Sequence, residues 1–128
     1  MADAFDTDMF AAVTEHLDTT NTVVIVTRRA DGTEKATPIW STVFDGRPYV
    51  RSAFGPDSWW YKRAIANWTA AFDVDGRRID VRLEHIEDAA TISGIDDAFS
   101  AKYAAEAADL VPMLTDESRA CTLRVLPA

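Results

Sequence analysis

The sequence predicts a mainly β domain with added helices, built as a small barrel of six antiparallel strands. Asp-Gly pairs occur three times between extended stretches, at 31–32, 45–46 and 75–76. Such pairs supply the positive φ angles of tight hairpin turns. Helical patterns occur at the start of the chain and after the third and fifth strands. Six antiparallel strands bury little as an open sheet, so closure into a barrel would remove the exposed edges.

The chain begins with a helical pattern and then changes to a β pattern. Apolar residues recur at helical spacing in the first segment, at Phe5, Met9, Phe10, Val13 and Leu17. The sequence "DTTN" then ends this pattern. The stretch "TVVIVTRR" at 22–29 is rich in β-branched residues and predicts a strand buried on both faces.

Six stretches read as strands bounded by turn residues. They are 22–29, 35–44, 48–53, 68–74, 77–86 and 120–127. In the fifth stretch, Ile79, Val81 and Leu83 share one face with His85, and charged residues occupy the other face. This alternation predicts a half-buried antiparallel strand.

Two more helices are expected between the strands. Asp57 or Ser58 can cap a helix that runs to about Ala66. The stretch "GIDDAFSAKYAAEAADL" at 94–110 predicts another helix. Pro112 either interrupts this helix or opens a last turn.

Length and charge limit the classes of function. The 128 residues form one domain, 1–128. The formal net charge of -8 disfavours nucleic acid as a partner. No run of 18 apolar residues occurs, so no membrane span is expected. The acidic start does not resemble a secretory signal, and the single cysteine, Cys121, suits a reducing cytoplasm.

Positive charge nevertheless gathers in residues 28–63. The cations are Arg28, Arg29, Lys35, Arg47, Arg51, Lys62 and Arg63, and the acids are Asp31, Glu34, Asp45 and Asp57. Seven cations against four acids leave this segment at +3. Such a patch would suit an anionic small ligand, and ordinary charge on hairpin edges is the alternative.

Three motifs resemble those of a known superfamily. They are "TPIW" at 37–40, "DGRPYVRSAFG" at 45–55 and "WWYKRAIANW" at 59–68. Their order is similar to that of the split-barrel flavin- and deazaflavin-binding proteins. These include the pyridoxamine phosphate oxidase-like proteins and the deazaflavin-dependent nitroreductases. The likeness covers 22–86 best, and implies a six-stranded antiparallel split β-barrel, a homodimer, and a place in a small bacterial branch.

The resemblance also implies nine cofactor-binding positions. The phosphate would be held at the end of the third strand and the start of the next helix, by Arg51, Ser52, Ser58, Lys62 and Arg63. The planar ring would lie along the second strand, near Thr37, Pro38, Ile39 and Trp40. A helix N-terminus and an Arg fork both suit phosphate, and Pro38 predicts an edge strand or a bulge. The alternatives are core or dimer packing for Trp40 and Trp60, and a solvated helix face for Lys62 and Arg63.

The implied cofactor is a deazaflavin coenzyme or FMN, and the implied function is hydride transfer to a small organic acceptor. A non-enzymatic dimeric module that binds a small ligand or cofactor is the alternative. No acid–base residue is assigned. No metal is expected, because the two histidines lack ligand spacing and the calcium-like "DVDG" is followed by two arginines.

Substitutions would separate these roles. Arg51→Ala and Lys62→Ala are expected to weaken cofactor binding and to leave the stability of the apo protein nearly unchanged. Trp60→Ala is expected to lower stability, because packing explains a tryptophan at this position well.

Overall fold

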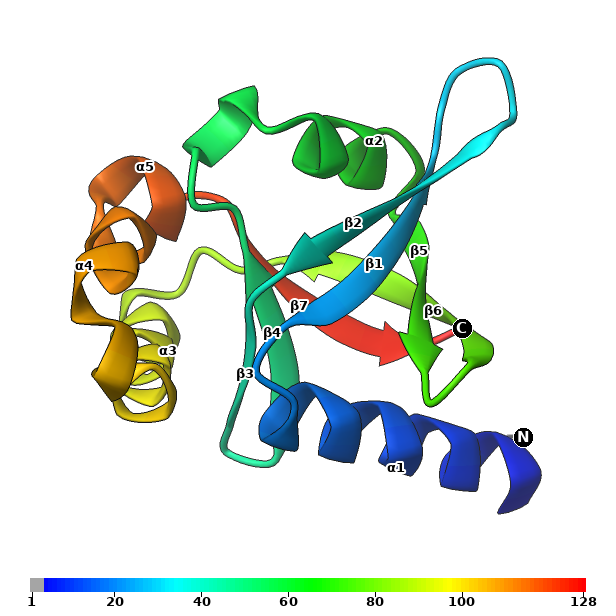
Figure 1. Cartoon of the computed structure of the whole chain (residues 1–128), viewed down its shortest axis with the longest axis horizontal. Coiled ribbons are helices and arrows are strands. Elements are labelled where there is room, and N and C mark those ends of the chain that lie inside the picture. The colour runs from blue at the N-terminus through cyan, green and yellow to red at the C-terminus, as the bar shows by residue number, and fades with distance from the viewer. Residues whose placement is uncertain (1–3) are drawn as a thin grey trace.

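The computed structural model describes the backbone from residue 4 to residue 128 and the side chains from residue 8 onward. Antiparallel strands form one curled sheet, and helices cover its ends and one side (Figure 1). The helices and strands are α1 (Ala4–Thr19), β1 (Val23–Arg28), β2 (Glu34–Ile39), β3 (Ser41–Phe44), β4 (Arg47–Arg51), α2 (Trp59–Asn67), β5 (Thr69–Val74), β6 (Arg77–His85), α3 (Ala89–Lys102), α4 (Ala107–Leu110), α5 (Asp116–Arg119) and β7 (Thr122–Pro127). Short 3₁₀ turns, Gly55–Asp57, Ala104–Glu106 and Val111–Leu114, connect some of them.

The sheet has the strand order β2-β1-β5-β6-β7-β4-β3. Its two edge strands are consecutive in the sequence, and only Trp40 separates them. The two edges therefore approach each other at this residue, which we call the seam. A curled sheet whose edges meet at one point is a split barrel, as predicted.

The prediction of six strands is corrected to seven, because the expected strand 35–44 is two strands. Pro38 lies in edge strand β2, opposite Val24. An edge strand tolerates proline because it pairs with a neighbouring strand on one side only. Trp40 leaves the sheet and stacks on Tyr103, with ring centroids 3.9 Å apart. The predicted edge position of Pro38 is thus confirmed.

The three predicted Asp-Gly turns are confirmed. They join β1 to β2, β3 to β4, and β5 to β6. In the second turn Asp45 and Gly46 have φ values of 54° and 74°, and in the third Asp75 and Gly76 have 53° and 84°. Positive φ at both central residues gives the tight hairpin turn that matches strand twist.

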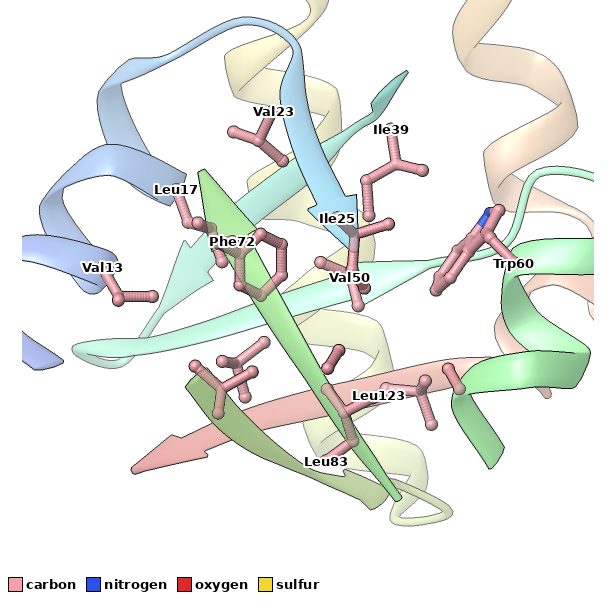
Figure 2. Close-up of a cluster of buried hydrophobic side chains, with 14 of the residues drawn as sticks. Val13, Leu17, Val23, Ile25, Ile39, Val50, Trp60, Phe72, Leu83 and Leu123 are labelled. Atoms are coloured by element: carbon pink, nitrogen blue, oxygen red, sulfur yellow. The ribbon is translucent and has the colours of Figure 1, made fainter. Parts of the chain in front are cut away.

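The main core fills the barrel (Figure 2). Residues from α1, the strands and α2 meet there, including Val13, Ile25 and Phe72, each fully buried. Strand β1 buries one face, while Val24 and Val26 on the other face are only half-buried, so the expected burial on both faces is wrong. The first helix is confirmed over α1, although the side chain of Phe5 lies outside the described residues.

The third helix differs from the expected range 94–110. Helix α3 begins at Ala89, because the Asp88 carboxylate accepts hydrogen bonds from the Thr91 backbone N–H and hydroxyl. It ends at Lys102, and short helical turns follow. Pro112 opens the last 3₁₀ turn, as one of the two expectations had it.

Strand β6 alternates as predicted, with Ile79, Val81 and Leu83 buried and the charged residues between them exposed. Cys121 is a buried free thiol in the main core. Within the described part of the chain, the helices are too short or too polar to cross a membrane.

Candidate functional site

A hollow of about 470 Å³ lies at the seam, between the end of β2, the start of α2 and the turns around α4. We call it the seam hollow. It is lined by Thr37, Pro38, Ile39, Trp40, Arg51, Ala53, Phe54, Ser58, Trp60, Asp109, Pro112 and Met113. Six of the nine predicted cofactor-binding residues are among these, because the edge strand and the helix start converge there.

The walls of the seam hollow are largely aromatic and apolar. Trp40 forms one wall and is held in place by its stack on Tyr103. Trp60 forms part of another, and it is only 6% exposed because most of the indole packs into the main core. Figure 2 shows Trp60 pointing from α2 toward Ile25 and Val50. The alternative of core packing is therefore confirmed for Trp60, although its edge also reaches the hollow.

Arg51 lies at the base of the seam hollow and its side chain is completely buried. Its Nε donates to the Thr122 hydroxyl at 2.8 Å, and its Nη1 donates to Asp96 at 2.5 Å and to the Met113 carbonyl at 3.0 Å. Burial lowers the pKa of Arg51, and the bond to Asp96 opposes this shift. The guanidinium therefore links β4, β7, α3 and the turn before α5.

One donor of this guanidinium has no partner. Arg51 Nη2 is buried and makes no hydrogen bond within the described structure. The N-terminus of α2 lies in the same hollow, where Ser58 occupies the cap position and its side chain makes no capping bond. A buried unpaired donor costs about 1–3 kcal/mol, and free helix amides attract anions. Together they make one end of the hollow suitable for an anionic group.

The structure does not bring the other three predicted residues to this hollow. Ser52 is fully buried, and its hydroxyl donates to the Gly55 carbonyl at 2.7 Å. Lys62 and Arg63 line a different hollow, which they share with Trp59, Ala66 and Asn67 of the same helix. The expectation that Arg51→Ala would leave the stability of the apo protein nearly unchanged assumed an accessible side chain. Because the Arg51 side chain is buried and bonded, this expectation no longer holds.

A second hollow, of about 650 Å³, lies between α2 and the turn end of the β1–β2 hairpin. We call it the cationic hollow. It is lined by Arg28, Arg29, Ala30, Gly32, Trp59, Lys62, Arg63, Ala66 and Asn67. The two hollows share no lining residue. The positive segment seen in the sequence is thus divided between two places.

Sequence reasoning missed the acidic partner of Arg51. Asp96 accepts from Arg51 on one oxygen and from Arg119 Nε on the other, at 2.8 Å. No local pattern marks this contact, since Asp96 lies 45 residues from Arg51. Asp109, in the short helix α4, and Met113, in the 3₁₀ turn that follows it, also line the seam hollow. Sequence reasoning did not predict them, because no local pattern places these segments beside β2. Among the described residues, no cluster of His, Cys, Asp and Glu gathers that could hold a metal ion.

The sequence profile of one protein family matches residues 14–125. That family is described as an uncharacterized protein conserved in bacteria, DUF2255. The chain belongs to this family. The sequence matches no curated protein.

Solved structures show the same fold at low sequence identity. An F420-H2 dependent reductase is 15% identical with a TM-score of 0.59, over 84% of this chain and 94% of that one. A putative pyridoxamine 5'-phosphate oxidase from Listeria innocua is 13% identical with a TM-score of 0.58, over 94% and 90%. HutZ, the heme storage protein from Vibrio cholerae, is 12% identical with a TM-score of 0.59, over 91% and 87%. These likenesses bear out the split-barrel resemblance seen in the sequence.

Proposed function

We propose that this DUF2255 protein is a flavin- or deazaflavin-dependent oxidoreductase that binds FMN or a deazaflavin coenzyme in the seam hollow. The observation that carries the proposal is the unpaired Nη2 of buried Arg51, in a hollow with aromatic walls and a free helix N-terminus. A hollow of about 470 Å³ is within the size range of small-molecule sites. Two fold relatives, named as an F420-H2 dependent reductase and a putative pyridoxamine phosphate oxidase, support a cofactor of this class.

The residues present fit such a cofactor at both of its ends. The anionic group would be held by the Ser58 hydroxyl, the first amides of α2 and Arg51 Nη2. The planar ring would lie along Thr37, Pro38, Ile39 and Trp40. Asp109, an acidic lining residue, favours an orientation in which the anionic group stays at the Ser58 end.

The bound cofactor would supply hydride transfer to a small organic acceptor. The protein residues bind and orient the ring, and the apolar walls exclude water from it. The backbone of edge strand β2 beside Pro38 can approach a planar ring closely, because no further strand covers it. The described lining of the hollow holds one carboxyl group, on Asp109, and we assign no proton donor.

We also propose that the protein is a homodimer whose partner covers the mouth of the seam hollow. Phe54 lines this hollow and is 76% exposed, and Val111, beside Pro112, is 65% exposed. Light scattering at micromolar concentration should give twice the mass of one chain. A monomer at that concentration would contradict the proposal.

Titration of the purified protein with FMN and with F420 tests the proposed site directly. We expect one of them to bind, and Ser58→Ala to weaken its binding about tenfold through loss of a bond to a charged group. Ser93→Ala is the matched control, because Ser93 is exposed on α3 and lines neither hollow. Failure of both cofactors to bind, or equal effects of the two variants, would refute the proposed site.

A non-enzymatic cofactor-binding module is the second candidate. It is favoured by the absence of a histidine, lysine or cysteine from the lining of the seam hollow and by the fold relative named as a heme storage protein. Single-turnover oxidation of the bound, reduced cofactor by a nitroaromatic acceptor distinguishes the two functions. If the bound, reduced cofactor transfers hydride to the acceptor faster than the free reduced cofactor does, the result supports the enzyme. Equal rates for bound and free cofactor support the binding module.

A further inference from the structure

The cationic hollow brings together positive charge from two separate parts of the chain. Arg28 and Arg29 come from the end of β1, and Lys62 and Arg63 come from α2 (Figure 1). The Asn67 amide ties the two parts together by donating to the carbonyls of Arg28, at 3.5 Å, and of Arg63, at 3.2 Å. The side chain of Asn67 thus joins the two segments, and all four cations line one hollow.

Among the residues that the structure describes, none of those that line this hollow is acidic. In the described part of the chain, none of its four cations takes part in a salt bridge. Arg29 Nη1 donates to the neutral Thr33 hydroxyl and to the Glu34 carbonyl, both at 3.3 Å, and Arg63 Nε donates to the Thr27 hydroxyl at 2.9 Å. Burial is the main cause that lowers the pKa of Arg63, and repulsion from the charge of nearby Arg29 adds to it. An anion in this hollow would relieve that repulsion.

The same hollow presents an exposed aromatic ring. Trp59 is 70% exposed, and Lys62 Nζ lies 4.5 Å from its ring centroid. Ala30 and Ala66 add apolar surface beside it. An indole that is left open to solvent next to unpaired cations is suited to stack on a planar ligand that also carries negative charge.

We propose that the cationic hollow binds a small aromatic phosphate monoester, with its ring on Trp59 and its phosphate among the four cations. A phosphate dianion matches several convergent cations better than a single carboxylate does, and arginine forks pair phosphate oxygens bidentately. A long polyanion is disfavoured, because the net charge of -8 on the chain would repel the parts outside the hollow. This site is distinct from the seam hollow and does not depend on the function proposed for it.

Calorimetric titration of the full chain with AMP tests the proposal. Arg29→Ala and Lys62→Ala should each weaken AMP binding about ten- to a hundredfold, as loss of a charge-assisted phosphate contact does. Arg47→Ala and Lys35→Ala are matched controls, because both residues are exposed and line neither hollow. Absence of AMP binding at millimolar concentration, or equal losses in the control variants, would overturn the proposal.

Two further ligands test the two halves of the site. Inorganic phosphate and adenosine should each bind more weakly than AMP, since each lacks one of the two recognised groups. An affinity for inorganic phosphate equal to that for AMP would overturn the role of Trp59.

The two proposed sites are separated by titrating FMN into protein that is already saturated with AMP. Lys62→Ala should then leave FMN binding unchanged, and Ser58→Ala should leave AMP binding unchanged. Loss of AMP binding in Ser58→Ala would overturn the second site alone. Weaker FMN binding in Lys62→Ala, with no effect of Ser58→Ala, would instead count against the seam hollow.

Discussion

The buried charge pair between Arg51 and Asp96 makes the strongest prediction about stability. The Arg51 side chain is fully buried, while Asp96 is 19% exposed and also accepts from Arg119. Asp96→Asn keeps the shape of the side chain but removes its charge. The substitution therefore leaves the buried guanidinium of Arg51 beside a second cation, Arg119, without a carboxylate between them.

Breaking a buried ion pair costs about 3–5 kcal/mol. Asp96 is partly exposed and asparagine keeps one acceptor oxygen, so we expect a loss at or below the bottom of this range, about 2–3 kcal/mol of the free energy of unfolding. This loss would lower the midpoint of urea unfolding by about 1–2 M for a chain of this size. Circular dichroism during urea titration measures it, and Asp97→Asn is the control, because Asp97 is exposed and forms no bond in the described structure.

A double substitution tests the physical reason. Arg51→Met in the Asp96→Asn background removes the unpaired buried charge, and Thr122 keeps a bond from its hydroxyl to the Arg119 carbonyl. The double variant should therefore be at least as stable as Asp96→Asn alone. A loss below about 0.5 kcal/mol in Asp96→Asn, as for an ordinary surface change, would refute the reasoning.

Two other predictions concern the packing of α3. A Cβ on Gly94 would lie 2.2 Å from the Phe44 ring, so Gly94→Ala should lower the free energy of unfolding by about 1–3 kcal/mol through overpacking. Ser93→Ala, the control, should cause no loss of stability. Equal midpoints of urea unfolding in the two variants would contradict this prediction. Burial lowers the pKa of Lys102 to about 8, from its ordinary 10.5. Between these pH values the unfolded chain binds a proton that the folded chain lacks, so this contribution to stability rises with pH. The unfolding free energy of the parent should accordingly rise relative to Lys102→Met between about pH 8 and 10, and a pH-independent difference would exclude this role.

Local chemistry was sufficient to predict the hairpins. In the second and third hairpins the Asp-Gly pair determines a tight turn through its own positive φ angles, whereas in the first hairpin only Gly32 has a positive φ. The alternation in β6 follows from the period of a strand with one buried face. The resemblance placed residues 37–40 together, and they stay together in the lining of the seam hollow because Thr37, Pro38 and Ile39 lie on β2 and Trp40 follows directly. In these cases the deciding interaction is between near neighbours in the chain.

Tertiary contacts decided the remainder. The break at Trp40 depends on Tyr103, 63 positions later, so periodicity alone predicted one strand where the fold has two. The sequence did not predict that Arg51 is buried and links several elements, because this depends on Asp96, Met113 and Thr122, which converge on it from distant parts of the chain.

The separation of Lys62 and Arg63 from Ser58 has the same origin. The sequence by itself determined that these residues share one helix with a cation-rich segment near it. Only the packing of α2 against β1 and across the seam decided which hollow each part of the helix faces. Its N-terminus faces the seam hollow, and Lys62 and Arg63 face the cationic hollow. A helix presents different faces to different neighbours, and the positions of those neighbours depend on sheet closure rather than on the helix sequence.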